Sequence, residues 1–532
     1  MSEKRKSIIE IAAPTLGIVS NVPRNIMEPR SQPTGLNARI KYGLNQKDYG
    51  TTLFGTDSSI GQPIYLINEA VFGAASVLQI HTNTTVYRNT GTSGLVFAVD
   101  GQTVSGTYGD YWAALQYNDA YIYCNGKGTM QYKASLATTG TDLGSAISPT
   151  TLNAYALGAL KDHLCLYHVW ENGTEYGKRV QWTKKGALTY SAGTTDFWSG
   201  TAGAIDLQDC EGYITNAVPL SGGIAVYAEN SIHMQQWIGG DEIYRFTKQV
   251  SEIGAISRRG VVSHGDVNYF LAENNVYAYY GGNDIRAIGD PIKATMFSEI
   301  NQSARKHAFV EYNSIDDIVN FHIPVNTDTS PTVVWSYDIK DESWMRKTSV
   351  YTEACEYGRT SAVTIGDLVG SIGDQNYQLG SLSPAAGERV QLYADPSGRI
   401  VKKDITVRSI SVGGTSTAQN WIYETPDLTG APQKDPNGSK VDFISTRQRW
   451  LQATIWASGN GTMAIECTTD GGRSYAVLPQ SPATLAVTGA PIVVSLQKRS
   501  PQLALRLSNT ELNSPVAVEY IKTEFIPGSD NA

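Results

Sequence analysis

Residues 267–280 read VNYFLAENNVYAYY, and this stretch shows the unit from which much of the chain is built. An apolar run over residues 267–271 leads to Asn274 and Asn275, and a second run rich in tyrosine and valine follows over residues 276–279. Valine, tyrosine and phenylalanine favour extended backbone, and asparagine favours a tight turn between two strands. The stretch therefore predicts a β-hairpin.

Similar hairpins recur along the chain from about residue 64. Their turns lie near positions 83, 125, 172, 230, 274, 327 and 374. Successive turns are about 42 to 58 residues apart, close to the roughly 40–50 residues of a propeller blade. One blade cannot bury both of its faces, whereas a ring of blades can. We expect an all-β fold with a β-propeller of six or seven blades over residues 61–395. An irregular β-sandwich whose turns are evenly spaced by chance is the alternative.

One segment breaks the strand pattern. Between Pro291 and His307, the apolar residues Ile292, Met296 and Ile300 recur at the spacing of one helical face. Proline is favoured in the first turn of a helix, where its missing N–H costs nothing. The pattern predicts a short helix between two blades.

The two ends of the chain differ from the repeats. Residues 1–60 carry four prolines that interrupt any periodic element. They predict an extended N-terminal arm that lies on the body or on a neighbouring subunit. Residues 396–532 contain further strand-like runs, such as 449–455 and 463–467, which predict a C-terminal β-sandwich domain. The proline-rich stretch 425–440 is typical of a long loop that makes contacts.

Charge argues against a protein that grips nucleic acid. The 532 residues include 42 Lys and Arg against 50 Asp and Glu, which gives a net charge of −8. Proteins that bind phosphates tightly present a basic face, and the densest basic run here is Lys4, Arg5 and Lys6. An acidic protein can still form a passive channel, because a repelling wall lets a polyanion slide.

Cysteine usage and hydropathy indicate folding in a reducing compartment. The five cysteines are far apart and none forms a CxxC pair, so we expect buried free thiols. The N-terminus has no apolar run of signal-peptide length, and no run of about 18 apolar residues predicts a membrane span.

The motifs of common enzymes are missing from the sequence. It contains no GxSxG, P-loop, GxGxxG or HExxH pattern. His163 and His168 are the closest histidines, and a separation of five in a strand places them on opposite faces. We expect no enzyme, no cofactor, and no catalytic, cofactor-binding or metal-binding residues.

Residues 468–475, TTDGGRSY, fit the Asp-box pattern S/T-x-D-x-G-x-S/T-aromatic and resemble the hairpin turns of sialidases. In such a turn Asp470 accepts backbone N–H groups, Gly472 allows positive φ, and the Tyr475 ring packs beneath. The motif occurs once, outside the repeats, so we interpret these three residues as a structural turn. The alternative functions are a carbohydrate-binding or glycan-cleaving, sialidase-like propeller and an intracellular propeller scaffold.

The order of several segments matches a known family. The stretch 222–234 is followed by 250–257, by 267–279, by 288–292 opening the helix, and by 334–344. This order resembles the tail hub proteins of short-tailed bacteriophages, also called tail nozzle or packaged-DNA stabilisation proteins. The likeness covers about residues 215–380.

The resemblance implies a role in the virion. Six copies would form a ring below the portal and adaptor proteins and contact tail needle or fibre proteins. The ring would enclose a channel that retains packaged double-stranded DNA and passes it during ejection without sequence-specific binding. It implies no catalytic residues, synthesis in the host cytoplasm, and a final location in the virion tail.

Overall fold

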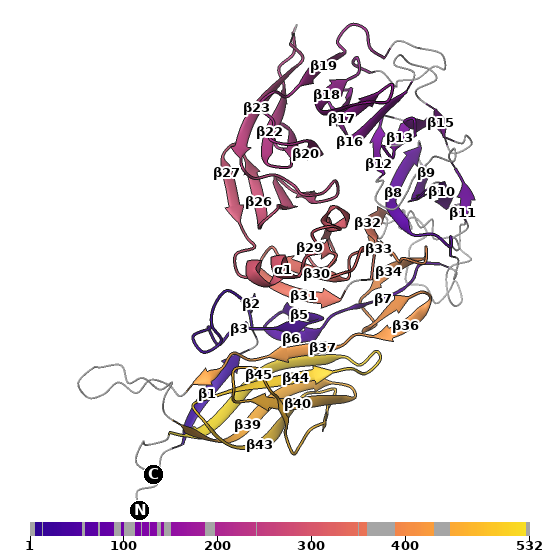
Figure 1. Cartoon of the computed structure of the whole chain (residues 1–532). Helices are drawn as coiled ribbons and strands as arrows, with labels where there is room; N and C mark the ends of the chain where they lie inside the picture. The colour runs from indigo at the N-terminus through magenta and orange to yellow at the C-terminus, as the bar shows by residue number, and fades with distance from the viewer. Residues whose placement is uncertain are drawn as a thin grey trace, which may run out of the picture.

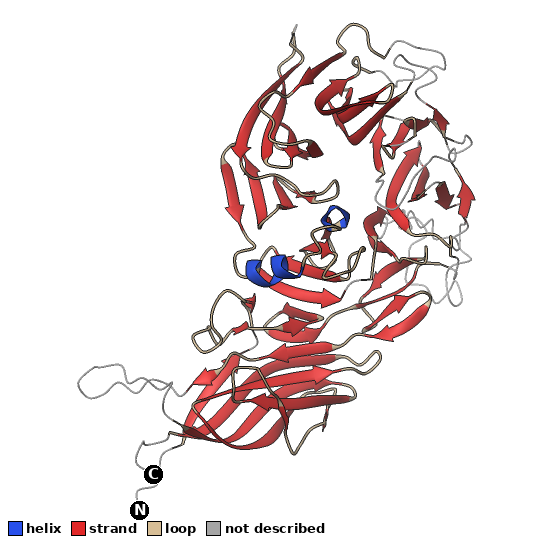
Figure 2. Cartoon of the chain, in the orientation of Figure 1, coloured by secondary structure: helices blue, strands red, loops and turns tan. Residues whose placement is uncertain are grey.

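Small antiparallel sheets form a ring at one end of the molecule, and two larger sheets lie at the other end (Figures 1 and 2). The computed structural model describes residues 6–527 except positions 13, 56–58, 73–74, 84, 90–96, 101–111, 119, 127, 136–139, 143–150, 187–196, 241, 349, 359–388 and 430–446. The predicted turn near residue 374 and most of the predicted loop 425–440 lie outside the described residues.

The ring contains seven sheets among the described residues, and each is built on three or four strands that are consecutive in the sequence. Blade 1 comprises β8 (Ile64–Phe72), β9 (Ala75–Thr82), β10 (Val86–Asn89) and β11 (Phe97–Val99). Blade 2 comprises β12 (Ala113–Tyr117), β13 (Ala120–Cys124), β14 (Gln131–Lys133) and β15 (Thr141–Asp142). Blade 3 comprises β16 (Leu152–Leu160), β17 (His163–Glu171), β18 (Thr174–Trp182) and β19 (Gly203–Asp206).

The remaining blades follow the same order around the ring. Blade 4 comprises β20 (Ile214–Leu220), β21 (Gly223–Ala228), β22 (Ser231–Trp237) and β23 (Tyr244–Ser251). Blade 5 comprises β24 (Val261–His264), β25 (Val267–Leu271), β26 (Val276–Gly281) and β27 (Asp284–Ala287). Blade 6 comprises β28 (Phe309–Asn313), β29 (Ile318–Ile323), β30 (Val333–Asp338) and β31 (Ser343–Thr348). The all-β, propeller-like fold class predicted from the repeats is confirmed.

Blade 7 combines strands from two distant parts of the chain. It comprises β32 (Glu353–Gly358), β33 (Arg389–Ala394), β34 (Ile400–Asp404) and β7 (Gly50–Leu53). Strand β7 pairs antiparallel with β34, so a segment of the predicted arm supplies the outer strand of the blade. The predicted boundary at residue 395 therefore falls inside this sheet, because β34 continues it to Asp404.

The ring is closed between blades 7 and 1. The first strands of neighbouring blades lie side by side all around the ring, including β32 against β8. Beneath this junction Ile64, Leu78 and Ile80 of blade 1 pack with Leu392 and Ile400 of blade 7. Burying one such side chain contributes about 1.5–3 kcal/mol, so apolar packing as well as strand pairing holds the ring shut.

A short helix lies between blades 5 and 6, as predicted. Helix α1 (Lys293–Glu299) buries Ile292, Met296 and Ile300 in a core that both blades share. It is shorter than the predicted segment because Ile300 turns to an extended conformation and forms a β-bridge with Val325. A single 3-10 turn follows at Arg305–His307.

Two further sheets pack face to face at the other end of the molecule (Figure 1). One contains β1 (Ser7–Ala12), β5 (Ala38–Lys41), β6 (Leu44–Lys47), β39 (Gln448–Gly459), β43 (Ala490–Ser500) and β45 (Val516–Ile526). The other contains β4 (Gly35–Leu36), β37 (Trp421–Glu424), β38 (Leu428–Thr429), β40 (Thr462–Thr468), β41 (Ala476–Val477), β42 (Ala483–Thr484) and β44 (Gln502–Asn509). The core between them includes Trp421, Trp450, Ile465, Leu505 and Ile521, all nearly inaccessible to solvent.

The predicted N-terminal arm lies on the body of the molecule. Its strands β1 and β6 pair with β45, and β4 pairs with β37. Strands β2 (Gly17–Ile18) and β3 (Ser31–Gln32) extend blade 6, where β2 pairs with β31. The hairpin β35 (Ser409–Val412) and β36 (Thr415–Ala418) links blade 7 to the C-terminal sheets. The N-terminal arm therefore contacts both the ring and the C-terminal sheets.

In the described part of the chain, no helix has both the length and the apolar character needed to cross a lipid bilayer. The five cysteines are free thiols, and four of them are buried.

Candidate functional site

The first strands of the seven blades surround a cavity on the axis of the ring, with a volume of about 460 Å³. Each of β8, β12, β16, β20, β24, β28 and β32 contributes lining residues. Small side chains on these strands, such as Ala113, Ala156 and Ala354, leave the space open. Ligand pockets for small molecules span roughly 300–1,000 Å³, so this axial cavity has the size of a small-molecule site.

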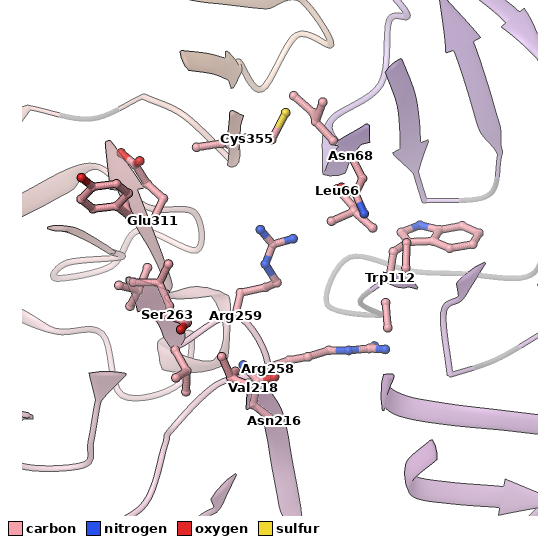
Figure 3. Close-up of a pocket in the computed structure, with 18 of the residues that line it drawn as sticks. Leu66, Asn68, Trp112, Asn216, Val218, Arg258, Arg259, Ser263, Glu311 and Cys355 are labelled. Carbon is pink, nitrogen blue, oxygen red and sulfur yellow. The ribbon is translucent and has the colours of Figure 1, made fainter. Parts of the chain in front are cut away.

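Arg259 points into the axial cavity from the segment that precedes β24 (Figure 3). Its backbone is held in place because its carbonyl accepts the N–H of Val310 at 2.8 Å. Its Nη2 donates to Oε1 of Glu353, a carboxylate on β32 whose side chain is 2% exposed. Burial raises the pKa of Glu353 to about 7, although Arg259 and the N–H of Ala354 act in the opposite direction. The ion pair connects the walls of blades 5 and 7.

Arg258, the preceding residue, also belongs to the lining. It is almost fully buried, and its Nη2 donates to the carbonyl of Ala154 at 3.3 Å. Its Cζ lies 4.6 Å from the centroid of the Tyr155 ring, a distance at which a cation is attracted to the ring face. Burial lowers the pKa of Arg258 and raises the pKa of the nearby Cys124 thiol. An arginine stays protonated at neutral pH, so this wall of the cavity is positive.

The neighbouring blade 6 carries the buried carboxylate of Glu311 on β28. Its oxygens accept hydrogen bonds from Nδ2 of Asn320 at 2.5 Å and from Nε2 of Gln391 at 3.0 Å. His322 lies 3.6 Å from the same carboxylate, and burial lowers the pKa of His322, which leaves the ring neutral at pH 7. Glu311 is therefore a structural anion whose oxygens are already hydrogen-bonded to Asn320 and Gln391.

Cys355 is a potential nucleophile in the lining of the axial cavity. Burial is the main cause that raises the pKa of its thiol, and the neighbouring Glu353 adds to the effect. A protonated thiol is a weak nucleophile. The geometry of the cavity is better suited to binding than to nucleophilic chemistry.

The three residues predicted to form a structural turn come together after β40. Asp470 Oδ1 accepts the N–H groups of Arg473 and Ser474, each at 3.0 Å, and the hydroxyl of Thr468 at 2.7 Å. The Ser474 hydroxyl also donates to Asp470, through Oδ2. This bond is the main cause that holds the pKa of Asp470 well below its usual range, and the others add to it. Gly472 has φ +84°, a backbone conformation that L side chains rarely adopt.

The same turn contacts the N-terminal arm. The Tyr475 hydroxyl donates to Oε1 of Glu424 at 2.5 Å, and Arg24 of the arm forms an ion pair with the same oxygen. A Cβ at Gly472 would lie 2.7 Å from Nη1 of Arg24, so glycine also gives the guanidinium room. Arg24 lies 3.5 Å from Asp427 as well, and its carbonyl accepts the Asp427 N–H at 3.2 Å. Sequence reasoning missed Arg24 and Glu424, because no local pattern links positions 400 residues apart.

A buried ion network fixes the arm against the ring. Asp48 lies 2.9 Å from the ammonium of Lys347 and 3.4 Å from that of Lys403. Lys403 also lies 3.4 Å from Asp316, which pairs with Arg39 of the arm at 2.9 Å. Burial favours the neutral form of Asp48, but the two ammonium groups prevail and hold its pKa well below the ordinary value. The network joins the arm to blades 6 and 7.

No family model matches the sequence, and no curated protein matches it. Solved structures with a similar course of the chain share little sequence with it. The WD40 domain of Neurospora crassa Pan2 is 9% identical, with a TM-score of 0.36 over 64% of this chain and 88% of that chain. The exo-beta-1,3-galactanase from Phanerochaete chrysosporium, solved with galactose, is 8% identical, with a TM-score of 0.25 over 89% of this chain and 100% of that chain.

Proposed function

We propose that this chain is a structural component of a bacteriophage tail. It would form a ring with copies of itself below the portal and adaptor, as a hub or nozzle that retains packaged DNA and lets it pass during ejection. The segments that resemble tail hub proteins support this proposal because they fold next to one another. They make up blades 4, 5 and 6, from β20 to β31, together with helix α1.

The observation that carries the proposal is the path of residues 7–53. The same segment adds a strand to blade 7, extends blade 6, and pairs with both C-terminal sheets. Buried ion pairs reinforce these joints, and removing one partner of such a pair costs about 3–5 kcal/mol. In a protein built in this way, the ring and the C-terminal domain resist separation, as a tail component under mechanical load requires.

In the proposed assembly DNA runs between subunits and not through one propeller. The axial cavity has the volume of a small-molecule pocket, and Arg259 in its lining pairs with Glu353 of blade 7. The duplex would therefore follow the axis of the ring of copies. The net charge of −8 favours a neutral or acidic channel wall, with basic residues in isolated rings.

Native mass spectrometry of the purified protein with its adaptor ring tests the proposal. We expect six copies of the 57.7 kDa chain, and the same stoichiometry in purified virions. Absence of the chain from purified particles would overturn the proposal. A glycan array and a sialidase assay on the same preparation test the alternative, and turnover of a glycan would favour the enzyme.

A further inference from the structure

We propose that the axial cavity binds a small oxyanion, a carboxylate or phosphate group, through the Arg259 guanidinium. This site goes beyond the assembly role and does not depend on it. Arginine offers five N–H donors in a fixed plane that matches the oxygens of such groups. The Arg259 side chain is 27% exposed and points into the cavity (Figure 3). Among the described residues, the Arg259 guanidinium donates one hydrogen bond, from Nη2 to Glu353, so its other N–H groups stay available to a ligand.

Two asparagines in the lining provide further donors. Oδ1 of Asn68 on β8 accepts the N–H of Glu69 at 3.0 Å, and Oδ1 of Asn216 on β20 accepts the N–H of Ala217 at 2.8 Å. These bonds assign the oxygen of each amide to the strand backbone. Each NH₂ group is then the part of the side chain that donates. That of Asn68 is shared with the Tyr121 hydroxyl, whereas that of Asn216 remains to donate to an oxyanion, which requires donors.

The acidic groups of the cavity are already engaged elsewhere. Glu311 accepts from Asn320 and Gln391, while Glu356 accepts from the Ser314 hydroxyl at 2.9 Å and pairs with Arg389 at 3.4 Å. A cationic ligand would have to displace these partners. An anion instead meets Arg259 and the positive field of the buried Arg258, so the arrangement selects negative charge.

Isothermal titration calorimetry at physiological ionic strength tests this site on the full-length protein. Sodium phosphate and sodium citrate are the two probes, with sodium chloride as the ionic-strength control. Binding of phosphate alone identifies a phosphate site, and binding of citrate alone identifies a carboxylate site. Arg259→Gln keeps a donor toward Glu353 and should weaken binding about tenfold or more, since charged hydrogen bonds contribute most of such affinity. Arg286→Gln removes the same charge from the outer strand β27, where Arg286 pairs with Glu342, and should leave affinity unchanged.

A second variant keeps the test decisive if Arg259→Gln does not fold. Asn216→Asp keeps the oxygen that accepts the Ala217 N–H, but it places a negative charge at the cavity wall. It should weaken binding as well, with an unchanged melting temperature. The proposal is overturned if neither probe binds the wild-type protein, or if Arg286→Gln loses as much affinity as the two cavity variants.

Discussion

The guanidinium of Arg24 forms an ion pair with the carboxylate of Glu424, 400 positions further along the chain. The hydroxyl of Tyr475 donates to the same carboxylate, and Tyr475 ends the turn that Asp470 organises. Arg506 lies with its Cζ 4.8 Å from the centroid of the Tyr475 ring. The Asp-box turn therefore supports the contact between the arm and the C-terminal domain.

Replacing Asp470 should destabilise the C-terminal domain without changing the axial cavity. In Asp470→Ala, the N–H groups of Arg473 and Ser474 lose their acceptor. We expect a lower melting temperature, measured by differential scanning calorimetry. Asp470→Asn keeps one acceptor oxygen and should lie between the wild type and the alanine variant. A normal melting temperature with loss of assembly would instead assign Asp470 a direct role in contacts.

Removing Arg24 should cost more than removing another arginine of the arm. Glu424 is fully buried, so Arg24→Ala leaves a buried carboxylate without its cation. We expect a loss of about 3 kcal/mol in the free energy of unfolding, measured with urea. Arg30→Ala is the matched control, because Arg30 pairs with Glu28 at an exposed position and exposed pairs contribute about 0–1 kcal/mol. Equal losses in the two variants would show that the arm is not held by Arg24.

The ion network at Asp48 should make stability sensitive to acid. The folded state holds the pKa of Asp48 below the unfolded value of 3.8, so this stabilisation is present above pH 4 and is lost as the pH falls further. Lys403→Met removes one of the two cations and should destabilise by about 3–5 kcal/mol at pH 7. The difference from the wild type should shrink below pH 4. A difference that does not change with pH would mean that the lost stability comes from packing of the lysine chain.

Glu353 should produce the opposite trend. Its folded pKa of about 7 exceeds the ordinary value of 4.5, so the folded state binds the proton more tightly than the unfolded state. Stability should fall as the pH rises from 4.5 to 7, by at most about 3 kcal/mol, and then level off. Glu353→Gln should remove this fall in a comparison of unfolding free energies at pH 5 and pH 8. Glu342→Gln, at the exposed pair with Arg286, should keep it. Parallel curves for Glu353→Gln and the wild type would contradict the assignment.

Duplex DNA should bind the free protein weakly and with little sequence preference. Each basic contact to phosphate adds affinity through counterion release, and acidic residues outnumber basic ones in this chain. Fluorescence anisotropy at several salt concentrations measures both the affinity and its salt slope. A nanomolar Kd at physiological salt with a steep slope would indicate a protein that grips DNA.

Local patterns in the sequence predict the parts of the fold that are held together locally. The 267–280 hairpin forms with Leu271 opposite Val276, and the spacing of Ile292, Met296 and Ile300 corresponds to a buried helical face. Residue type decides such elements, because turn chemistry and periodicity act over a few positions.

The parts that escaped prediction depend on distant partners. Strand β7 reads GTTL, which has no apolar alternation, and only its pairing with β34 makes it a strand. Asp48 and Lys403 have no signal of their own, since a buried ion pair looks like two surface charges in a sequence. No single motif predicts the axial cavity either, because seven separate strands line it.

The closure of blade 7 by β7 has a consequence for synthesis of the protein on the ribosome. Strand β7 emerges early, but its partner β34 is translated roughly 350 residues later. At about 5–20 residues per second, this delay lasts on the order of 20–70 s. Until then Leu78 and Ile80 lack the apolar partners that blade 7 provides. Molecular chaperones would encounter an incomplete ring for about three-quarters of the period of translation.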